Sequence, residues 1–397
     1  MTGSGRTEST VGSDALAQRG ADLEIAIVGA GAVGATVAYD LTREGANVTL
    51  YDRGDVASGA TGRAAGICYD AFAGGLDAAI ASESIERFRA LSGDDTFPFV
   101  ECPYVWFARD GDTERADAIR EQVRRMQDNG VVALEMDGDA LADRFPALRT
   151  EDIEVAGVAG ASGYADPTEY AVSLATTAAD SGATLETETP VEVRVDPARV
   201  IRTDGDAREF DAVLVAAGAR TANLLADAGV SLAMKPYRVQ ALVAGADFAE
   251  PMCYDATGGF YLRPHADGLL AGDGTENREA DPDAYDRDAD STFATDLGER
   301  VAHRVPAIDD TGKRGFDRAW AGLCTATPDR DPLVGDVRDG LYVATGFQGH
   351  GFMRAPAIGR RLAEEMLGGA GIGAFDPTRF DGDEGFDVLE GLALDPN

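Results

Sequence analysis

LEIAIVGAGAVGATVAYDLTREGANVTLYD, residues 23–52, contains a strand, a glycine turn, a helix and a second strand in quick succession. The apolar runs LEIAIV and NVTLY predict buried strands, and the spacing of apolar residues in AVGATVAYDL predicts a helix. Between the first strand and the helix, Gly29, Gly31 and Gly34 form a GxGxxG motif. These glycines allow the tight turn, the approach of backbone to a pyrophosphate, and close packing of helix on strand. The stretch therefore predicts a βαβ unit that binds a dinucleotide.

The carboxylate at the end of this unit supports the same interpretation. Asp52 follows the second strand, where a carboxylate can accept a hydrogen bond from a ribose hydroxyl. Ala30, Ala32 and Val33, which lie between the glycines, are expected to contact the cofactor through their backbone. The motif and the acid are typical of both NAD and FAD enzymes, so they leave the choice of dinucleotide open.

Outside this unit the chain predicts one more buried strand and a second type of sheet. DAVLVAAG, residues 211–218, is apolar on both faces and is expected to join the first parallel sheet. Between residues 234 and 316 the pattern changes to alternating strands, which indicates an antiparallel sheet. We predict an α/β fold, with α+β character in the second domain: a Rossmann-like dinucleotide-binding domain with an inserted antiparallel-sheet substrate domain. The predicted boundaries are a flexible tail at 1–21, the binding domain at 22–100, 151–233 and 316–372, the substrate domain at 101–150 and 234–315, and an acidic tail at 373–397.

Composition narrows the setting of the protein. The 397 residues carry a formal charge of −35, and Lys235 and Lys313 are its only lysines. Such an acidic chain repels phosphates, which argues against nucleic acid as a partner, and it is typical of proteins adapted to a salt-rich cytoplasm. Four dispersed cysteines predict neither a metal site nor a disulfide framework. Without a signal peptide or a long apolar run, we expect a cytoplasmic protein with no transmembrane segment.

Five further stretches carry a resemblance to a known family. They are DRGDVASGATGRAAGI at 52–67, GYADPTEY at 163–170, VLVAAGART at 213–221, WAGLCTATPDRDPLVG at 320–335 and LYVATGFQGHGFMRAPAIGR at 341–360. In order and spacing they resemble the D-amino-acid-oxidase-like superfamily of FAD-dependent oxidoreductases. The chain is most similar to the branch with sarcosine oxidase, dimethylglycine dehydrogenase and the β-subunit of dye-linked proline dehydrogenase. The resemblance selects FAD, bound noncovalently, as the expected cofactor.

The resemblance also implies where the cofactor lies. One set of expected contacts follows Asp52 and includes residues near two later strands: Arg53, Ser58, Thr61, Arg63, Ala64, Ala65, Gly66, Val191, Ala217 and Gly218. A second set belongs to the turn TGFQGHGFM, which is expected to lie against the flavin ring: Gly346, Gly349, His350, Gly351, Phe352 and Met353. Bare N–H groups at a helix start can stabilise negative charge on the reduced flavin. Pro356 is expected in the first turn of that helix.

Four residues are candidates for contact with the substrate. His350 is expected to position backbone and ring edge, with proton transfer or packing alone as alternatives. Tyr261 is expected in the pocket wall, Arg263 is a candidate for an anionic substrate group, and Cys324 stands where the amino-acid oxidases of the superfamily often have arginine. Leu270 and Met353 occupy places where sarcosine oxidase has lysines, one of which promotes the reaction with oxygen.

The sequence therefore predicts an FAD-dependent oxidoreductase that oxidises a carbon–nitrogen bond in a small amine or amino acid. A dehydrogenase that passes electrons to a protein or quinone acceptor is favoured over an oxidase. Three alternatives stay open: a flavin-holding subunit of a multi-component dehydrogenase, a D-amino-acid or glycine oxidase, and a simple NAD-dependent dehydrogenase.

Overall fold

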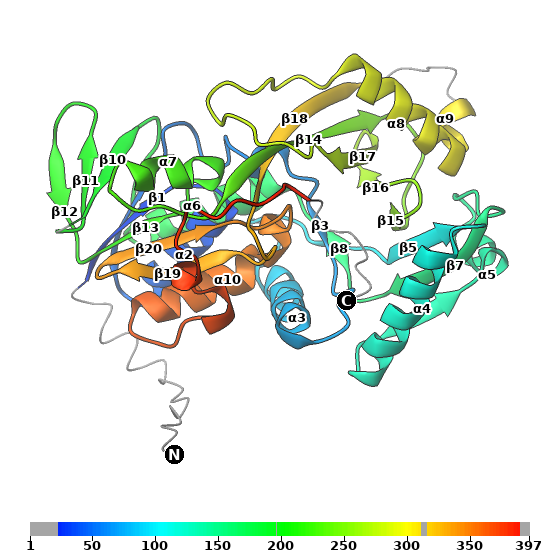
Figure 1. The fold of residues 1–397 in the computed structure, drawn as a ribbon, viewed down its shortest axis with the longest axis horizontal. Helices are drawn as coiled ribbons and strands as arrows, with labels where there is room; N and C mark the ends of the chain where they lie inside the picture. The colour runs from blue at the N-terminus through cyan, green and yellow to red at the C-terminus, as the bar shows by residue number, and fades with distance from the viewer. Residues whose placement is uncertain (1–22, 196, 311–315, 390–397) are drawn as a thin grey trace.

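The computed structural model describes residues 23–195, 197–310 and 316–389. The predicted tail at 1–21 and Lys313 lie outside these ranges. A parallel sheet with its helices forms one half of the molecule, and a larger, mainly antiparallel sheet runs through the other half (Figure 1). This arrangement confirms the predicted fold class.

The first half is built on a six-stranded sheet in the order β19-β20-β13-β1-β2-β9. Five of its strands, from β20 to β9 in this order, run parallel, and β19 pairs antiparallel with β20. The stretch DAVLVAAG supplies β13, which lies between β1 and β20, so this sheet joins segments from distant parts of the chain. The strands are β1 (Glu24–Val28), β2 (Asn47–Tyr51), β9 (Thr184–Glu186), β13 (Ala212–Val215), β19 (Leu333–Arg338) and β20 (Leu341–Thr345).

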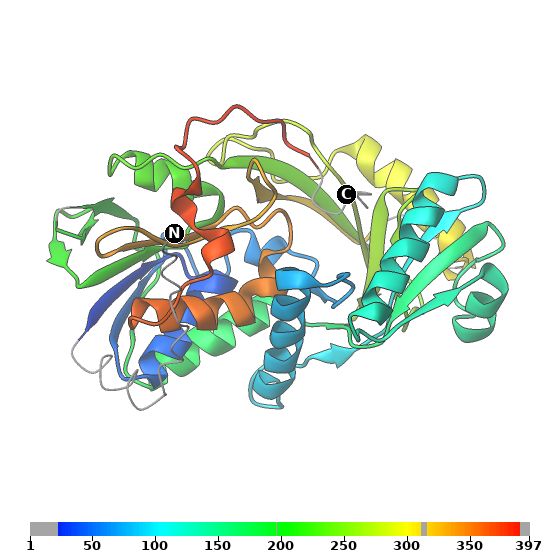
Figure 2. The same cartoon turned by 60° about the horizontal axis from the view of Figure 1, so that its bottom comes forward.

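Different elements cover the two faces of the parallel sheet. Helices α2 (Ala32–Arg43), α6 (Pro167–Asp180) and α10 (Gly351–Met366) pack together on one face, with α3 (Gly75–Leu91) against α10 (Figure 2). Alternate strand residues such as Ile25 and Ile27 point toward these helices. Ala26 and Val28 face the other side, where they join a separate apolar cluster. That side is covered by β10 (Val191–Arg194), β11 (Arg199–Arg202), β12 (Ala207–Glu209) and α7 (Thr221–Ala226).

The second half contains an eight-stranded sheet in the order β18-β14-β17-β16-β15-β5-β7-β6. All neighbouring strands pair antiparallel except β15 and β5. The strands are β5 (Tyr104–Arg109), β6 (Ala133–Met136), β7 (Ile153–Ala159), β14 (Lys235–Ala244), β15 (Met252–Asp255), β16 (Phe260–His265), β17 (Gly268–Thr275) and β18 (Arg318–Ala326). The helices of this half are α4 (Thr113–Asp128), α5 (Gly138–Arg144), α8 (Ser291–Arg304) and α9 (Ala307–Asp310).

Two of these strands differ from the predicted division of the chain. The prediction places β7 and β18 with the cofactor-binding domain, but both hydrogen-bond within the eight-stranded sheet. Alternation of apolar residues identifies a strand, whereas its partner is decided by long-range pairing that no local pattern contains. A small sheet of β3 (Ile67–Cys68), β8 (Gly163–Tyr164) and β4 (Val100–Glu101) lies among the connections between the two halves.

The eight-stranded sheet has two unlike faces. Tyr104 and Trp106 of β5 and Tyr254 of β15 belong to the same apolar cluster as α2 and α10, so this face turns toward the first half. Val105, Phe107 and Cys253 point the opposite way and pack with α5 and α8. Because successive strand residues alternate between faces, one sheet forms the wall of a site and the core behind it.

The described part of the predicted acidic tail is packed against the protein. Short 3₁₀ helices at Gly373–Phe375 and Pro377–Arg379 are followed by residues 380–389, which we call the C-terminal strap (Figure 2). Val388 of the strap is buried against Tyr237 and Ala326. The Lys235 side chain donates a hydrogen bond to the Phe386 carbonyl. This segment therefore differs from the flexible tail that its lack of periodicity suggests; residues 390–397 lie outside the described ranges.

Candidate active site

The first glycine turn connects β1 to α2 and is closely packed. A Cβ on Gly34 would lie 1.9 Å from the Gly29 carbonyl oxygen, and a Cβ on Gly29 would lie 2.4 Å from the Ala216 carbonyl oxygen. Gly29 also has a φ of 115°, which other residues rarely adopt. The turn therefore has room for backbone only, with Ala30, Ala32 and Val33 buried in it.

Asp52 lies beside this turn, as predicted. Its carboxylate accepts hydrogen bonds from the backbone N–H groups of Ala30 and Gly54, at 2.8 and 2.9 Å. Burial raises the pKa of Asp52, and these two hydrogen bonds oppose that rise. The Thr61 hydroxyl accepts from the Ala32 N–H at 3.0 Å, so the segment after Asp52 folds back onto the start of α2.

That segment also touches the eight-stranded sheet. The Trp320 indole donates to the Arg63 carbonyl at 3.1 Å, and the Arg263 guanidinium donates to the Ala65 carbonyl. The Arg63 side chain folds over its own loop and donates to the Ser58 carbonyl at 2.9 Å. Residues 57–66 therefore lie between the first turn and the sheet, which brings most of the first predicted set together.

Four of the predicted cofactor residues lie in different surroundings. Gly218 follows β13, directly beside β20, and its carbonyl accepts a hydrogen bond from Thr345 at 3.3 Å; Ala217 comes just before it. Val191 begins β10 in the small sheet and packs on the cluster behind β1. Arg53 is exposed and pairs with Asp283 at 3.3 Å.

The second glycine turn connects β20 to α10 and has the same form. Gly346, Gln348 and Gly349 all have positive φ, at 75°, 51° and 83°. Helix α10 begins at Gly351, without a side-chain cap at its N-terminus. Pro356 is therefore inside the helix instead of in its first turn, because the turn ends, and the helix begins, earlier than the sequence pattern suggests. Phe352 and Met353, near the start of this helix, are buried.

The two turns open at the same edge of the parallel sheet. β1 and β20 are separated only by β13, so their ends lie about 10 Å apart at the usual strand spacing. Helices α2 and α10 start from these ends and pack side by side. Two helix N-termini therefore point toward one region, where both helix dipoles can stabilise negative charge.

His350 occupies the end of the second turn and is 8% exposed. Its Nε2 lies 3.2 Å from the Tyr69 hydroxyl. Burial, helped by the nearby Arg354, lowers the pKa of His350 to about 3, so the imidazole is neutral at ordinary pH. Arg354 itself pairs with Asp77 at 2.8 Å. A neutral, buried imidazole fits a positioning role better than transfer of a proton at neutral pH.

The other three catalytic candidates lie on the sheet face that turns toward this region. Tyr261 is paired with Tyr254 on one side and Gly272 on the other, and burial raises its pKa well above the usual value. A Cβ on Gly272 would lie 2.3 Å from the Tyr261 hydroxyl, so this glycine makes room for the ring. Tyr261 therefore lies within the eight-stranded sheet, packed against the apolar cluster that the sheet shares with the first half.

Arg263 and Cys324 are fixed by their neighbours. Arg263 is buried, lies over the Tyr164 ring, and uses backbone carbonyls of Ala65 and Pro264 as acceptors, while burial lowers its pKa. It therefore supports the cofactor-binding loop as well as the sheet. The Cys324 sulfur would lie 3.9 Å from a Cβ on Gly349, and burial raises its pKa to about 11.

Sequence reasoning missed two residues of this region. Tyr69 lies against His350, and Gln348 connects the second turn to the C-terminal strap through its amide, which donates to the Leu389 carbonyl at 2.7 Å. Tyr69 stands in no motif, Gln348 lies in the second turn but was given no role, and their partners are 281 and 41 residues away. The one local sign that Gln348 has a structural role was its place in the turn between Gly346 and Gly349.

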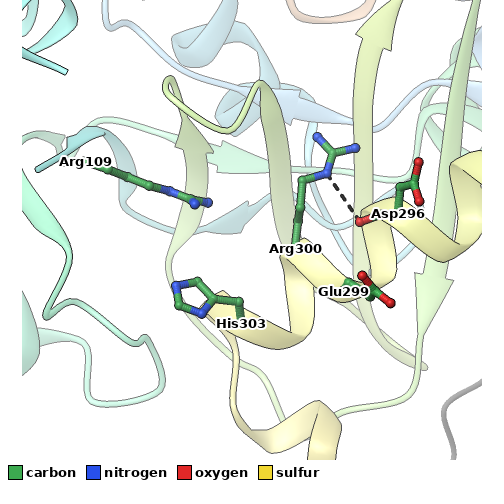
Figure 3. Close-up of a pocket in the computed structure, with 5 residues that line it drawn as sticks. All are labelled: Arg109, Asp296, Glu299, Arg300 and His303. Carbon is green, nitrogen blue, oxygen red and sulfur yellow. Dashed lines mark hydrogen bonds between the residues drawn. The ribbon is translucent and has the colours of Figure 1, made fainter. Parts of the chain in front are cut away.

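A separate surface depression lies behind the sheet (Figure 3). It has a volume of about 350 Å³ and is lined by Arg109, Asp296, Glu299, Arg300 and His303. Its basic groups are already paired: Arg109 with Asp255 at 2.6 Å, His303 with Asp152 at 3.3 Å, and Arg300 with Asp273. Charges balanced in this way give the depression no strong preference for an anion or a cation.

The geometry of the two turns fits FAD. The first offers backbone and a carboxylate to the pyrophosphate and ribose of an adenine dinucleotide, and the second offers backbone N–H groups to a group with developing negative charge. A family model described as FAD dependent oxidoreductase (DAO) matches residues 24–365. The chain belongs to this family. FAD is therefore its cofactor, and the NAD alternative is wrong.

Individual relatives and solved structures agree with the family. The chain is 28% identical to glycine oxidase from Geobacillus kaustophilus (strain HTA426), covering 86% of this chain and 92% of that protein. It is also 28% identical to 4-methylaminobutanoate oxidase (formaldehyde-forming) from Paenarthrobacter nicotinovorans, covering 90% of this chain but 45% of the relative. The crystal structure of L-proline dehydrogenase from P. horikoshii superposes with a TM-score of 0.81 at 26% identity, over 90% and 97% of the two chains. These relatives support an FAD-dependent oxidoreductase that acts on amine or amino-acid substrates.

Among the described residues, none of the helices is both long enough and apolar enough to span a membrane.

Proposed function

We propose that this protein oxidises the carbon–nitrogen bond of a small amine or amino acid, of the kind represented by sarcosine, dimethylglycine or proline, and that it acts as a dehydrogenase. The neutral character of the site carries this proposal. His350 has a pKa of about 3, and burial raises the pKa values of Tyr69 and Tyr261. These groups are uncharged at ordinary pH, so they provide no ready base.

Oxidation of a neutral amine by loss of a hydride needs no base. The carbon beside nitrogen loses a hydride while the nitrogen lone pair forms the new C=N bond. FAD, when bound between the two turns, would supply the acceptor for that hydride. Tyr254 and Tyr261 would hold the substrate against the ring, and the backbone N–H groups at the start of α10 would stabilise the negative charge that develops there.

Flavin bleaching tests this function directly. Anaerobic protein at high salt is mixed with sarcosine, dimethylglycine, proline or glycine, and absorbance near 450 nm is followed (roughly, a property of oxidised flavin). We expect bleaching with at least one of them. Tyr261→Phe should retain FAD and bleach more slowly. Coloured, folded protein that none of these amines bleaches would contradict the proposal.

The proposed preference for an electron acceptor other than oxygen rests on which positions of the chain carry a lysine. Leu270 is buried on β17 opposite Arg263, where the resemblance suggests a lysine in oxidases. Lys235 is engaged with the strap. Turnover with an artificial dye should therefore exceed turnover with oxygen by at least tenfold, and equal rates would contradict it. Leu270→Lys is the matched variant, which should raise the oxygen rate.

We also propose that FAD is held noncovalently. Cys324 lies beside the second turn, but a thiol with a pKa of about 11 is protonated and a poor nucleophile. Cys68, Cys102 and Cys253 are buried, and burial raises their pKa values as well. Acid precipitation should leave the yellow colour in the supernatant; a yellow pellet would contradict this proposal.

One observation favours a second candidate function. The chain spans 45% of the length of 4-methylaminobutanoate oxidase and 44% of dimethylglycine dehydrogenase from Rattus norvegicus. A flavin-holding subunit that works with a partner would match this partial coverage. It would bind FAD without being bleached alone, and would be bleached by substrate once a co-purified partner is added.

A further inference from the structure

Four arginine side chains are buried in the part of the chain that the structure describes, and one of them differs from the rest. Three have a carboxylate oxygen at 3.0 Å or less: Arg238 has Asp290, Arg304 has Asp152, and Arg354 has Asp77. The fourth, Arg263 on β16, is 5% exposed and has no carboxylate at ion-pair distance among the described residues. Its charge is therefore buried without a counterion from the protein.

The groups that contact the Arg263 side chain are neutral. Its Nε donates to the Ala65 carbonyl, and its Nη1 donates to the Pro264 carbonyl at 2.6 Å. The guanidinium carbon lies 4.8 Å from the centre of the Tyr164 ring. These contacts fix the position of the guanidinium but do not balance its charge. Because a buried charge without a counterion is costly, this position favours a bound anion.

Part of the Arg263 guanidinium is free to bind that anion. A guanidinium carries five N–H groups, and Nη2 of Arg263 donates to none of the described residues. Some polar atoms of the described chain are fully buried without a partner, such as Nε1 of Trp106, but none of these atoms belongs to Arg263. Nη2 has no partner and is not fully buried, so it borders a space that a water-sized molecule can reach.

Arg263 also lies beside the residues that are proposed to hold the substrate. Alternate residues of a strand share a face, so Arg263 points the same way as Tyr261. Leu262, between them, belongs to the core behind the sheet. Tyr261 stands opposite Tyr254, and two residues along a strand separate its Cα from that of Arg263 by about 7 Å. A small molecule that contacts Tyr261 through its amine end can therefore reach Arg263 with its other end.

We propose that Arg263 binds the carboxylate of the substrate, so that the enzyme selects amino acids over amines that lack a carboxylate. This inference rests on the proposed function and narrows its substrate class. A carboxylate is the anion that a guanidinium binds best in this setting, because it accepts strong, charge-assisted hydrogen bonds. Sarcosine, dimethylglycine and proline each carry one. Dimethylamine and pyrrolidine have comparable carbon–nitrogen bonds and no carboxylate.

Binding of a matched ligand pair tests the inference without turnover. Furan-2-carboxylate carries the anion, and furan-2-carboxamide has the same ring with a neutral group of similar shape. Neither has an amine carbon that could lose a hydride. Dissociation constants are measured, at one fixed salt concentration, from the change in the flavin spectrum of the FAD-loaded protein. The wild type should bind the carboxylate at least about tenfold more tightly than the amide, the size of one charge-assisted hydrogen bond.

Substitutions of Arg263 should change this ratio in a graded way. Arg263→Gln removes the charge and should bring the ratio close to one. Arg263→Lys restores the charge and should recover part of the preference, because an ammonium lacks the planar fork of a guanidinium. Arg318→Gln removes an exposed arginine of the same sheet and, as the matched control, should keep the wild-type ratio. A preserved ratio in Arg263→Gln, or no response of the wild-type flavin to either ligand, would overturn the inference.

A second pair of variants covers the case in which Arg263→Gln loses FAD. Leu270 stands directly opposite Arg263 on β17. Leu270→Glu supplies the missing carboxylate from within the protein, and Leu270→Gln adds a neutral group of the same size. Leu270→Glu should be the more stable of the two in urea and should have the smaller preference for furan-2-carboxylate, because the guanidinium already has its anion. Lower stability of Leu270→Glu, or equal ligand ratios in the two variants, would contradict the role of Arg263.

Anaerobic bleaching of the same proteins separates this inference from the proposed function. Proline and pyrrolidine are compared in parallel. Bleaching by both at equal rates, with ligand ratios insensitive to Arg263, would remove the selection of amino acids and keep the function. Bleaching by no amine, with a tenfold ligand ratio that depends on Arg263, would remove the function and keep the carboxylate site.

Discussion

The two glycine turns that open α2 and α10 have the same form and differ in steric freedom. In the first, an added Cβ on Gly34 would overlap the Gly29 carbonyl at 1.9 Å. In the second, an added Cβ on Gly349 would have no neighbour closer than the Tyr237 hydroxyl at 3.7 Å. Gly34 is therefore required by packing of the fold, and Gly349 by backbone conformation and by the space left for a ligand.

The largest effect is expected from Gly34→Ala. Its Cβ meets backbone that cannot move without separating α2 from β1, so we expect a loss of at least about 3 kcal/mol of unfolding free energy and loss of FAD. Urea unfolding and the FAD content of the purified protein are the measurements. Gly31→Ala is the control for folding, because its Cβ would meet only the Thr61 hydroxyl at 3.0 Å. Equal stability of Gly34→Ala and the wild type would end the distinction between the turns.

Gly349→Ala should have a smaller effect of a different kind. A φ of 83° costs an alanine about 1–2 kcal/mol, while the open surroundings let the fold persist. We expect folded protein with FAD affinity reduced about tenfold, measured by flavin fluorescence titration. Gly373→Ala, where φ is not positive and no atom lies within 4 Å, should leave both properties unchanged. A variant that unfolds like Gly34→Ala would mean that the second turn is also required by packing.

The two turns should also respond to pH in opposite directions. The pKa of His350 falls from 6.5 unfolded to about 3 folded, so its contribution to stability is present above pH 6.5 and is lost as pH falls toward 3. One such group changes the unfolding free energy by up to about 1.4 kcal/mol per pH unit. The raised pKa of Asp52 acts the other way, because its contribution is present below 3.8 and is lost as pH rises through its folded pKa.

The contribution of His350 is the unfolding free energy of the wild type minus that of His350→Phe, both measured by urea unfolding at pH 4 to 7. A difference that does not change over this range would contradict the buried, neutral imidazole. The same subtraction with Asp52→Asn, taken between about pH 3 and 5, should have the opposite slope.

The smallest effect is expected where the strap supports the second turn. Gln348→Ala removes the hydrogen bond to the Leu389 carbonyl and should weaken FAD binding about fivefold, near 1 kcal/mol. Leu389→Ala keeps that carbonyl and alters an exposed side chain, so its FAD affinity should equal that of the wild type. If both variants bind FAD like the wild type, the strap does not support the turn.

Local physics explains which parts of this protein could be predicted from its sequence. The first turn was predictable because strand, glycines, helix and Asp52 follow one another within 30 residues of chain. The second turn was found through its family resemblance, and the position of Pro356 was wrong because a helix start depends on the backbone of the turn before it. The C-terminal strap is an extended segment held by a few contacts, and such a segment can pack without a regular spacing of apolar residues.

Residues whose role depends on distant partners were not predictable. Tyr69 acquires its environment from β5 and from His350, and β7 and β18 acquire their sheet from partners elsewhere in the chain. A sequence pattern reports which face of a strand is buried, but not which strand lies beside it.

The position of β13 between β1 and β20 has a consequence for how the protein matures. β1 and β20 come from opposite ends of the described chain and β13 from its middle, so the two glycine turns are brought side by side only when all three strands have paired. A ligand that contacts both turns, as FAD is expected to do, therefore binds the native state in preference to a chain in which these strands are unpaired. By mass action, free FAD at 100 times its dissociation constant would stabilise the folded protein by about 2.7 kcal/mol, so the supply of cofactor in the cell would set how much of the enzyme persists.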